Sequence, residues 1–234
     1  MRPVFAIRAV FVAAAAIVPA LAQAQQIGAA AVVQNDVRRV DGGNSAAIGG
    51  GDAVVRNETI ATAAASSAKL VFTDETNLAI GASARVTLDK FVYAGDQGSY
   101  SAAAVNVATG AFRFTTGNSA KKAYTISTPV ATIGVRGTIL DILSAPARTT
   151  VVLQEGEATV CTRLEKKRRC VDLLHAGDSV IVTVSGGSSQ TRFSSKPGWT
   201  FAATCLANPA LCDRTTFAQA APAAADDMAA LCGR

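Results

Sequence analysis

The sequence predicts an all-β fold, an antiparallel β-sandwich or β-roll of many short strands. From Lys69 onward, apolar and polar residues alternate, as expected of half-buried strands. Gly, Pro and Asn residues recur at short intervals between these runs and mark turns. No helix of ten or more residues is expected outside the N-terminal apolar segment, and residues 226–231 are the one other helical candidate.

The first 24 residues are expected to be a signal peptide. Arg2 and Arg8 precede an apolar run, Ala9–Leu21, and this run is too short to cross a bilayer as a stable helix. Small residues follow, and we expect cleavage near Ala22 or Ala24. The alternative is a retained membrane anchor. No later stretch has about 18 uninterrupted apolar residues, so no stable membrane span is expected after cleavage, and the mature protein should be periplasmic or secreted.

The mature chain is expected to have three parts. Residues 25–68, rich in Ala, Gly and Asn, predict loops and short edge strands that lead into the β domain. Residues 69–186 form its core, in which the alternation slips after Leu88 and predicts a bulge near Asp89 and Lys90. Residues 187–234 form a Cys-containing extension, and its Ala/Pro-rich tail from Phe217 to Arg234 is expected to be largely disordered apart from what Cys232 anchors. The expected core strands contain Leu70 and Phe72, Leu78 and Ile80, Arg85–Leu88, Val105 and Val107, Phe112 and Phe114, Tyr124 and Ile126, Ile133 and Val135, Leu140 and Ile142, Val151–Leu153, Ala158–Val160, Val171–Leu174, and Ser179–Val184.

Five cysteines in an exported chain indicate disulfides, because the compartment is oxidising. Cys161 and Cys170 flank a hairpin whose antiparallel pairing sets them opposite each other, which predicts a cross-strand disulfide. Cys205 and Cys212 are further disulfide candidates on either side of a turn, but their pairing and that of Cys232 stay open. The odd number leaves one thiol that is free or links two chains in a homo-oligomer. Zinc needs about four ligands in a characteristic spacing, and no metal or cofactor is predicted.

The charge balance does not predict a nucleic-acid partner. Twenty-two Lys and Arg residues against 17 Asp and Glu residues give a net charge of only +5. Five of these positive residues cluster at the tip of the expected Cys161–Cys170 hairpin. This tip either contacts anionic lipids or acidic glycans or is a solvated loop. These residues are Arg163, Lys166, Lys167, Arg168 and Arg169.

No catalytic constellation is visible, so an enzyme is not predicted. His175 is the single histidine and stands beside an expected turn, without a nucleophile near it in the sequence. Glu155 and Glu157 flank Gly156, where a solvated turn is expected instead of a pair of hydrolytic carboxylates.

The strongest candidate site is the run STPVATIGVRGT, Ser127–Thr138. Its proline must begin a strand or lie at an edge, and the glycines on either side of Val135 and Arg136 permit a twist or a close approach. Arg136 either receives a carboxylate from a ligand or partner, or pairs internally with an acid such as Asp141 or with turn carbonyls. The candidate binding residues are Thr128, Pro129, Gly134, Arg136, Gly137 and Thr138.

Together with four other runs, this segment resembles the FecR domain. The others are GDAVVRNETIAT, LVFTDETNLAIG, VLQEGEATV and HAGDS, and in the family's order they cover about residues 46–184. The resemblance implies a periplasmic, β-rich sensory or binding module of the kind named after a regulator of iron-citrate uptake. That regulator relays a signal from an outer-membrane transducer to a sigma factor. This sequence departs from it, because we expect no cytoplasmic segment before the apolar run, no retained span and no transducer-docking domain.

Two functions are therefore predicted. The first is a non-enzymatic module that binds a ligand, a glycan or another protein of the cell envelope. The alternative is a structural or surface-assembly protein that oligomerises through strand edges or the spare cysteine.

Overall fold

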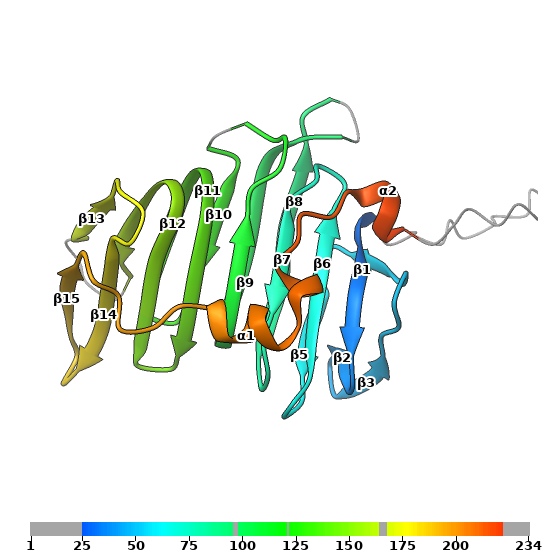
Figure 1. Ribbon diagram of the computed structural model, residues 1–234, viewed down its shortest axis with the longest axis horizontal. Helices are drawn as coiled ribbons and strands as arrows, with labels where there is room; N and C mark the ends of the chain where they lie inside the picture. The colour runs from blue at the N-terminus through cyan, green and yellow to red at the C-terminus, as the bar shows by residue number, and fades with distance from the viewer. Residues whose placement is uncertain (1–24, 96–97, 121, 164–167, 222–234) are drawn as a thin grey trace, which may run out of the picture.

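The computed structural model describes residues 25–95, 98–120, 122–163 and 168–221, and the expected signal peptide lies outside these ranges. It confirms the all-β prediction, since the strands form one 15-stranded sheet (Figure 1). The strands are β1 Gln26–Gln34, β2 Val37–Asp41, β3 Asn44–Ala47, β4 Ala53–Val55, β5 Thr59–Thr62, β6 Ser67–Phe72, β7 Asn77–Ile80, β8 Arg85–Tyr93, β9 Tyr100–Thr115, β10 Tyr124–Ser127, β11 Ala131–Ala145, β12 Arg148–Thr162, β13 Cys170–Leu173, β14 Ser179–Ser185 and β15 Ser188–Ser194. The described helices are short: α1 Ala202–Ala207, η1 Pro209–Leu211 and α2 Phe217–Ala220.

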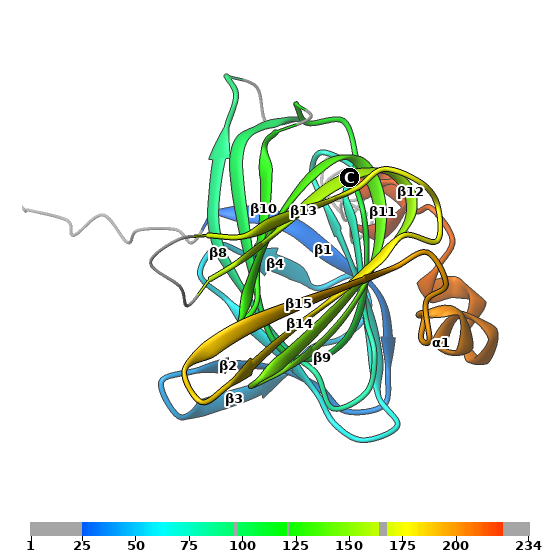
Figure 2. The ribbon, with the colours of Figure 1, turned by 90° about the vertical axis from the view of Figure 1, so that its left-hand side faces the viewer.

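The sheet folds back on itself because three long strands, β9, β11 and β12, run through both of its layers. The first part of β9 pairs with β8 and β10, whereas its last part pairs with β7 and β11. One layer, here called the back layer, contains β3, β2, β5, β8, β10 and β13 with the adjoining parts of the long strands. The front layer contains β4, β1, β6, β7, β14 and β15 with the other parts (Figures 1 and 2).

The hydrophobic core lies between the two layers. Phe72 of the front layer lies 5.1 Å from Phe91 of the back layer, measured between ring centroids, and Phe114 lies at the same distance from Tyr124. These four side chains are at most 3% exposed and belong to one continuous apolar cluster. Burial of this kind contributes about 25 cal/mol per Å² of apolar surface removed from water, so the core holds the layers together.

Several local expectations can be compared with the strands. The register of β8 against β9 shifts between Leu88 and Lys90, so the predicted bulge is confirmed. The pairing of β10 with β9 is parallel, in contrast to the antiparallel pairing expected throughout. Within residues 25–68 the structure has more than edge strands, because β1 lies between β4 and β6 with Ile27 fully buried.

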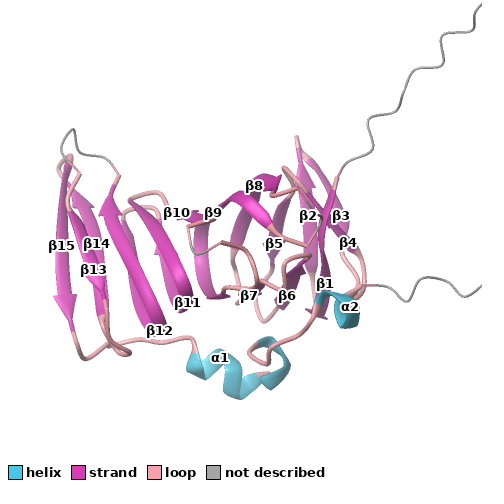
Figure 3. Cartoon of the chain, turned by 90° about the horizontal axis from the view of Figure 1, so that it is seen from above, coloured by secondary structure: helices cyan, strands magenta, loops and turns pink. Residues whose placement is uncertain are grey.

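The chain after β15 crosses the outer face of the front layer. This segment, residues 195–221, is here called the strap; it contains all three short helices and runs from β15 to β1 (Figures 1 and 3). Phe201 and Leu211 are buried against Ala79, and Ala220 is buried against Ala29 and Val71. The expectation of disorder from Phe217 onward was wrong for α2, while residues 222–234 lie outside the described ranges.

Candidate functional site

The first half of the Ser127–Thr138 segment forms the tight turn between β10 and β11. Thr128 closes this turn: its backbone N–H donates to the Ala131 carbonyl at 2.8 Å, and its Oγ1 accepts the Ala131 N–H at 2.9 Å. Pro129 therefore lies in the turn, two residues before β11 begins, where its missing N–H leaves no gap in the ladder. Thr128 is 2% exposed, so it serves the structure of the turn.

The second half of the segment is a sharp bend within β11. Gly137 has a φ of +61°, and the register against β12 shifts between Arg136 and Ile139. Thr138 secures the bend: its Oγ1 accepts the Arg136 N–H at 2.8 Å and donates to the Glu157 carbonyl at 2.9 Å. The expected twist is present at Gly137, and the Thr138 hydroxyl links the Arg136 backbone to that of Glu157 on β12.

The Arg136 side chain points away from these contacts. It is exposed, and within the ranges that the structure describes its guanidinium has no hydrogen bond and no ion pair. It lines a pocket of about 180 Å³ with Glu157, Thr159, Asp172 and others. Gly134 pairs with Thr159 on this face and has nothing within 4 Å of where a Cβ would stand, so it leaves the surface beside Arg136 open.

The pocket mixes one positive charge with two carboxylates. Glu157 is opposite Arg136 in the register of β11 and β12, yet the two form no ion pair. Asp172 accepts a hydrogen bond from Thr159 Oγ1 at 2.7 Å. The donor fork of Arg136 is thus available to a carboxylate or phosphate, and the two acids are available to donors or cations on the same partner.

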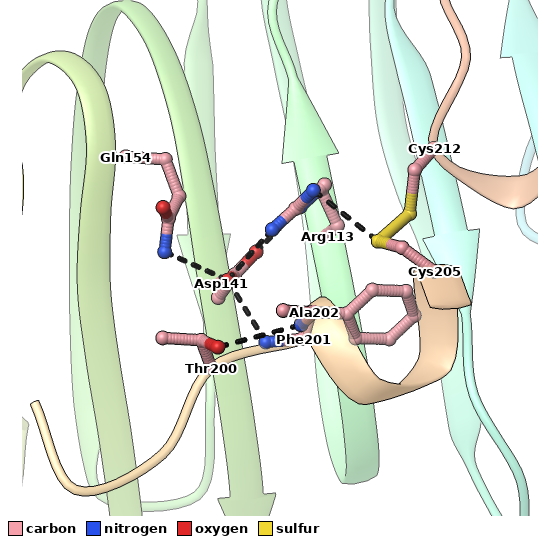
Figure 4. A network of polar contacts seen from close by, with 8 residues as sticks. All are labelled: Arg113, Asp141, Gln154, Thr200, Phe201, Ala202, Cys205 and Cys212. Atoms are coloured by element: carbon pink, nitrogen blue, oxygen red, sulfur yellow. Dashed lines mark hydrogen bonds and ion pairs between the residues drawn. A yellow bond between two sulfur atoms is a disulfide. The ribbon is translucent and has the colours of Figure 1, made fainter. Parts of the chain in front are cut away.

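Asp141, the internal partner considered for Arg136, pairs with a different residue. Arg113 Nε and Nη2 donate to its two carboxylate oxygens at 2.7 and 2.9 Å, and this bidentate geometry is the strong form of the pair. Asp141 Oδ2 also accepts from Gln154 Nε2 and from the Phe201 backbone N–H, both at 2.9 Å (Figure 4). Asp141, the example of an internal acid considered for Arg136, is therefore not its partner.

This network ties the strap to the sheet. Arg113 Nη1 donates to Cys205 Sγ at 3.3 Å, and its guanidinium lies 5.9 Å from the centre of the Phe201 ring (Figure 4). Cys205 is bonded to Cys212, so the second disulfide closes a loop within the strap. A buried charge is stable only with well-placed hydrogen-bond partners, and one partner of Asp141 is the backbone N–H of Phe201 in the strap.

Lys69 forms a second tie between the sheet and the strap. This side chain is 2% exposed; its Nζ donates to the carbonyls of Ala210 and Asp213 and to Thr215 Oγ1. Burial lowers the pKa of Lys69, and the charge of Asp213 partly offsets this. The sequence gives no local signal for such a contact, because the partners are more than 140 residues away.

The Cys161–Cys170 prediction is confirmed. The two residues are direct partners of β12 and β13, their Cα atoms lie 4.0 Å apart, and the disulfide is present. Of the basic residues at this hairpin, Arg163 Nη1 donates to the Thr128 carbonyl at 3.1 Å, so it supports the turn before β11. Arg168 and Arg169 are exposed, while Lys166 and Lys167 lie outside the described ranges.

The remaining sequence candidates are placed as follows. His175 is 84% exposed, and its Nδ1 lies 3.5 Å from Asp178 Oδ2. Glu155 and Glu157 are exposed, and Gly156 between them continues β12 with a φ of +81°, so the expected turn is a bend within a strand. Among the described residues, no group of three or more His, Cys, Asp or Glu side chains could hold a metal ion, and no helix there is long and apolar enough to cross a membrane.

One buried polar cluster escaped the sequence reasoning. Asp74 is fully buried and accepts hydrogen bonds from Thr76, from Ser119 Oγ and from Tyr124 Oη at 3.0 Å. Burial, followed by the Asp74 charge, raises the pKa of Tyr124 well above its usual value. The cluster holds residues 116–119, and Thr116 Oγ1 in turn accepts the Thr138 N–H at 2.7 Å. It therefore supports the bend below Arg136.

Fold and site together define a β-rich module with an open polar surface at one bend of its longest strands. Residues 58–159 match the family described as FecR protein, in agreement with the resemblance seen in the sequence. No curated protein matches the chain.

Two solved structures are similar to the chain. Both are crystal structures described as a "putative anti-sigma factor" from Parabacteroides distasonis ATCC 8503, each 14% identical in sequence, with TM-scores of 0.45 and 0.43. Each match covers 57% of this chain and 58% of the other. The chain thus spans less than two thirds of the length of the structures it matches.

Proposed function

We propose that the protein is an exported, non-enzymatic sensory module that binds a ligand or another protein of the cell envelope through the surface around Arg136. The main support for this proposal is the difference between the backbone and the side chain of Arg136. The Arg136 backbone is fixed by Thr138, whereas its guanidinium has no partner within the described ranges. Because the main chain is already fixed, less conformational entropy is lost when a partner binds. The guanidinium supplies hydrogen-bond donors to that partner.

The cellular location is supported by the disulfides. Cys161–Cys170 and Cys205–Cys212 are both formed, and disulfides persist in oxidising compartments. An envelope location also agrees with the basic and apolar N-terminal residues, which match a secretory signal in composition.

Site-specific cross-linking in cells tests the proposal. A photo-cross-linking amino acid replaces Gly134, which has open space above it, and in a second strain it replaces Arg56, an exposed residue of a turn preceding β5. We expect a cross-linked partner from position 134 and none of the same mass from position 56. Introducing Arg136→Glu beside the probe at position 134 should abolish the product.

Two results would contradict the proposal. One is the same product from both positions, which would indicate random collision. The other is a product at position 134 that persists in full with Arg136→Glu, provided that the variant melts at the same temperature as the parent protein.

A further inference from the structure

A second polar hollow lies over β12, β14 and β15, on the outer face of the front layer. It has a volume of about 390 Å³ and is lined by Arg148, Ile181, Thr183, Gln190, Thr191 and Arg192. The hollow shares no residue with the pocket at Arg136. Sequence reasoning did not single out any of its side chains.

Strand register brings the two arginines to the same face of the sheet. Arg148 pairs with Thr183, and Thr183 pairs with Gln190, so these three side chains form a row across three strands. Arg192 pairs with Ile181, two positions along β14, and therefore points to the same side. Neighbouring strands lie about 4.8 Å apart, so β12 and β15 are separated by about 10 Å, a gap that two arginine side chains can bridge over β14.

The hollow is positively charged and its donors are unused. No carboxylate lines it, and Arg148 and Arg192 form no hydrogen bond or ion pair with the residues that the structure describes. Arginine stays protonated throughout the physiological pH range. Two like charges facing one hollow repel each other, and an anion between them would remove that repulsion.

The donors around the hollow indicate the chemistry of the anion. The two arginines stand on the strands that flank β14, and the Thr183 hydroxyl and the Gln190 amide add neutral donors to the same hollow. A single carboxylate has two oxygens, which one arginine already satisfies. A phosphate group offers more oxygens in several directions, and so it can accept from donors on all three strands.

We propose that this hollow binds a phosphate group. The donors come from three hydrogen-bonded strands, so the backbone beneath the site is fixed before the ligand arrives. The phosphate belongs either to a small soluble molecule or to a lipid headgroup, and these two sources present the same chemistry to the arginines. The proposal does not depend on the surface around Arg136.

Calorimetric titration with pyrophosphate tests the site on the full chain with both disulfides intact. We expect saturable binding that weakens as salt is added. In the double variant Arg148→Ala/Arg192→Ala the affinity should fall at least about tenfold, because two charge-assisted contacts are lost. The matched control is Arg56→Ala/Arg85→Ala, which removes the same charge from exposed positions elsewhere and should bind within about twofold of the parent protein.

Vesicles distinguish the source of the phosphate. Co-sedimentation with phosphatidylcholine vesicles that contain phosphatidylglycerol, but not with pure phosphatidylcholine, would assign the hollow to a lipid headgroup if the double variant loses it. Pyrophosphate binding without vesicle binding would assign it to a soluble ligand. The proposal fails if neither probe binds, or if the double variant and the control lose binding equally.

Discussion

Thr138 and Arg136 are two positions apart in the same segment but have opposite roles. Thr138 is 1% exposed, and its hydroxyl joins two strands, whereas the Arg136 side chain is exposed and unpartnered within the described part of the chain. Both lie in the run that carried the family resemblance. Sequence similarity thus marks a scaffold position and a surface position alike.

Substitution separates these two roles. Thr138→Val should lower the free energy of unfolding by about 1–3 kcal/mol, because the Arg136 N–H loses its acceptor and the Glu157 carbonyl loses its donor. Thr138→Ser keeps the hydroxyl and should be closer to the parent protein. Arg136→Ala should change stability by no more than about 0.5 kcal/mol. Urea unfolding measures all three, and a large loss in Arg136→Ala would show that Arg136 has a structural role.

Asp178 in the HAGDS run caps a turn. Its Oδ2 accepts the backbone N–H groups of His175 at 2.9 Å and Leu174 at 3.0 Å, and these bonds lower the pKa of the carboxyl. A carboxyl whose pKa is lower in the folded than in the unfolded protein stabilises the fold when it is ionised. This contribution is complete above the unfolded pKa of about 3.9 and is lost as the pH falls through the folded value.

The pH dependence of Asp178→Asn tests this contribution. Near neutral pH the variant should be less stable than the parent protein, because a neutral amide is a weaker acceptor than a carboxylate. The difference should shrink as the pH falls below about 4. Urea unfolding between pH 2 and pH 7 gives both curves, and a difference that stays constant over this range would contradict the role of the charge.

At the scale of elements, the bend of β11 and β12 requires two glycines that face each other. A Cβ at Gly156 would stand 2.0 Å from the Gly137 carbonyl oxygen, and Gly156 has a φ of +81°. Gly187, in the β14–β15 turn, has nearly the same φ of +78° but nothing within 4 Å of its Cβ position. Comparing Gly156 with Gly187 therefore distinguishes the effect of backbone strain from the effect of steric crowding.

Alanine at the two positions should therefore have unequal effects. Gly187→Ala should lower stability by about 1–2 kcal/mol through its left-handed backbone alone. Gly156→Ala should lower it further, because one of two bent strands must move. Thermal unfolding of both variants measures the gap, and equal melting temperatures would show that the bend can relax without loss.

The sequence predicted the elements whose signals are local. Alternation gave the strands, the phase slip after Leu88 gave the bulge, and the spacing of Cys161 and Cys170 gave a strand register. The strap was missed because its ties join residues far apart in the chain: Lys69 to Ala210, and Asp141 to Phe201. The run around Arg136 was found from the sequence, but the pairing of Asp141 with Arg113 was not, because these two residues are 28 positions apart on different strands.

At the scale of the whole molecule, the two disulfides account for four of the five cysteines. The fifth, Cys232, lies outside the described residues. We expect the oxidised monomer to react with one equivalent of a thiol-alkylating reagent, seen as a single added mass in intact mass spectrometry. Any covalent dimer on a non-reducing gel should disappear in Cys232→Ser. A dimer that persists in that variant would show that one of the two internal disulfides is exchanged between chains.

The strap is the last described part of the chain to be synthesised, yet it supplies the oxygen atoms that surround a lysine in the sheet. A shortened chain that ended at β15 would leave the Lys69 ammonium group on an apolar face with only solvent to contact. Cleavage of the chain before Ala210 would thus expose both a charge and the hydrophobic surface around it.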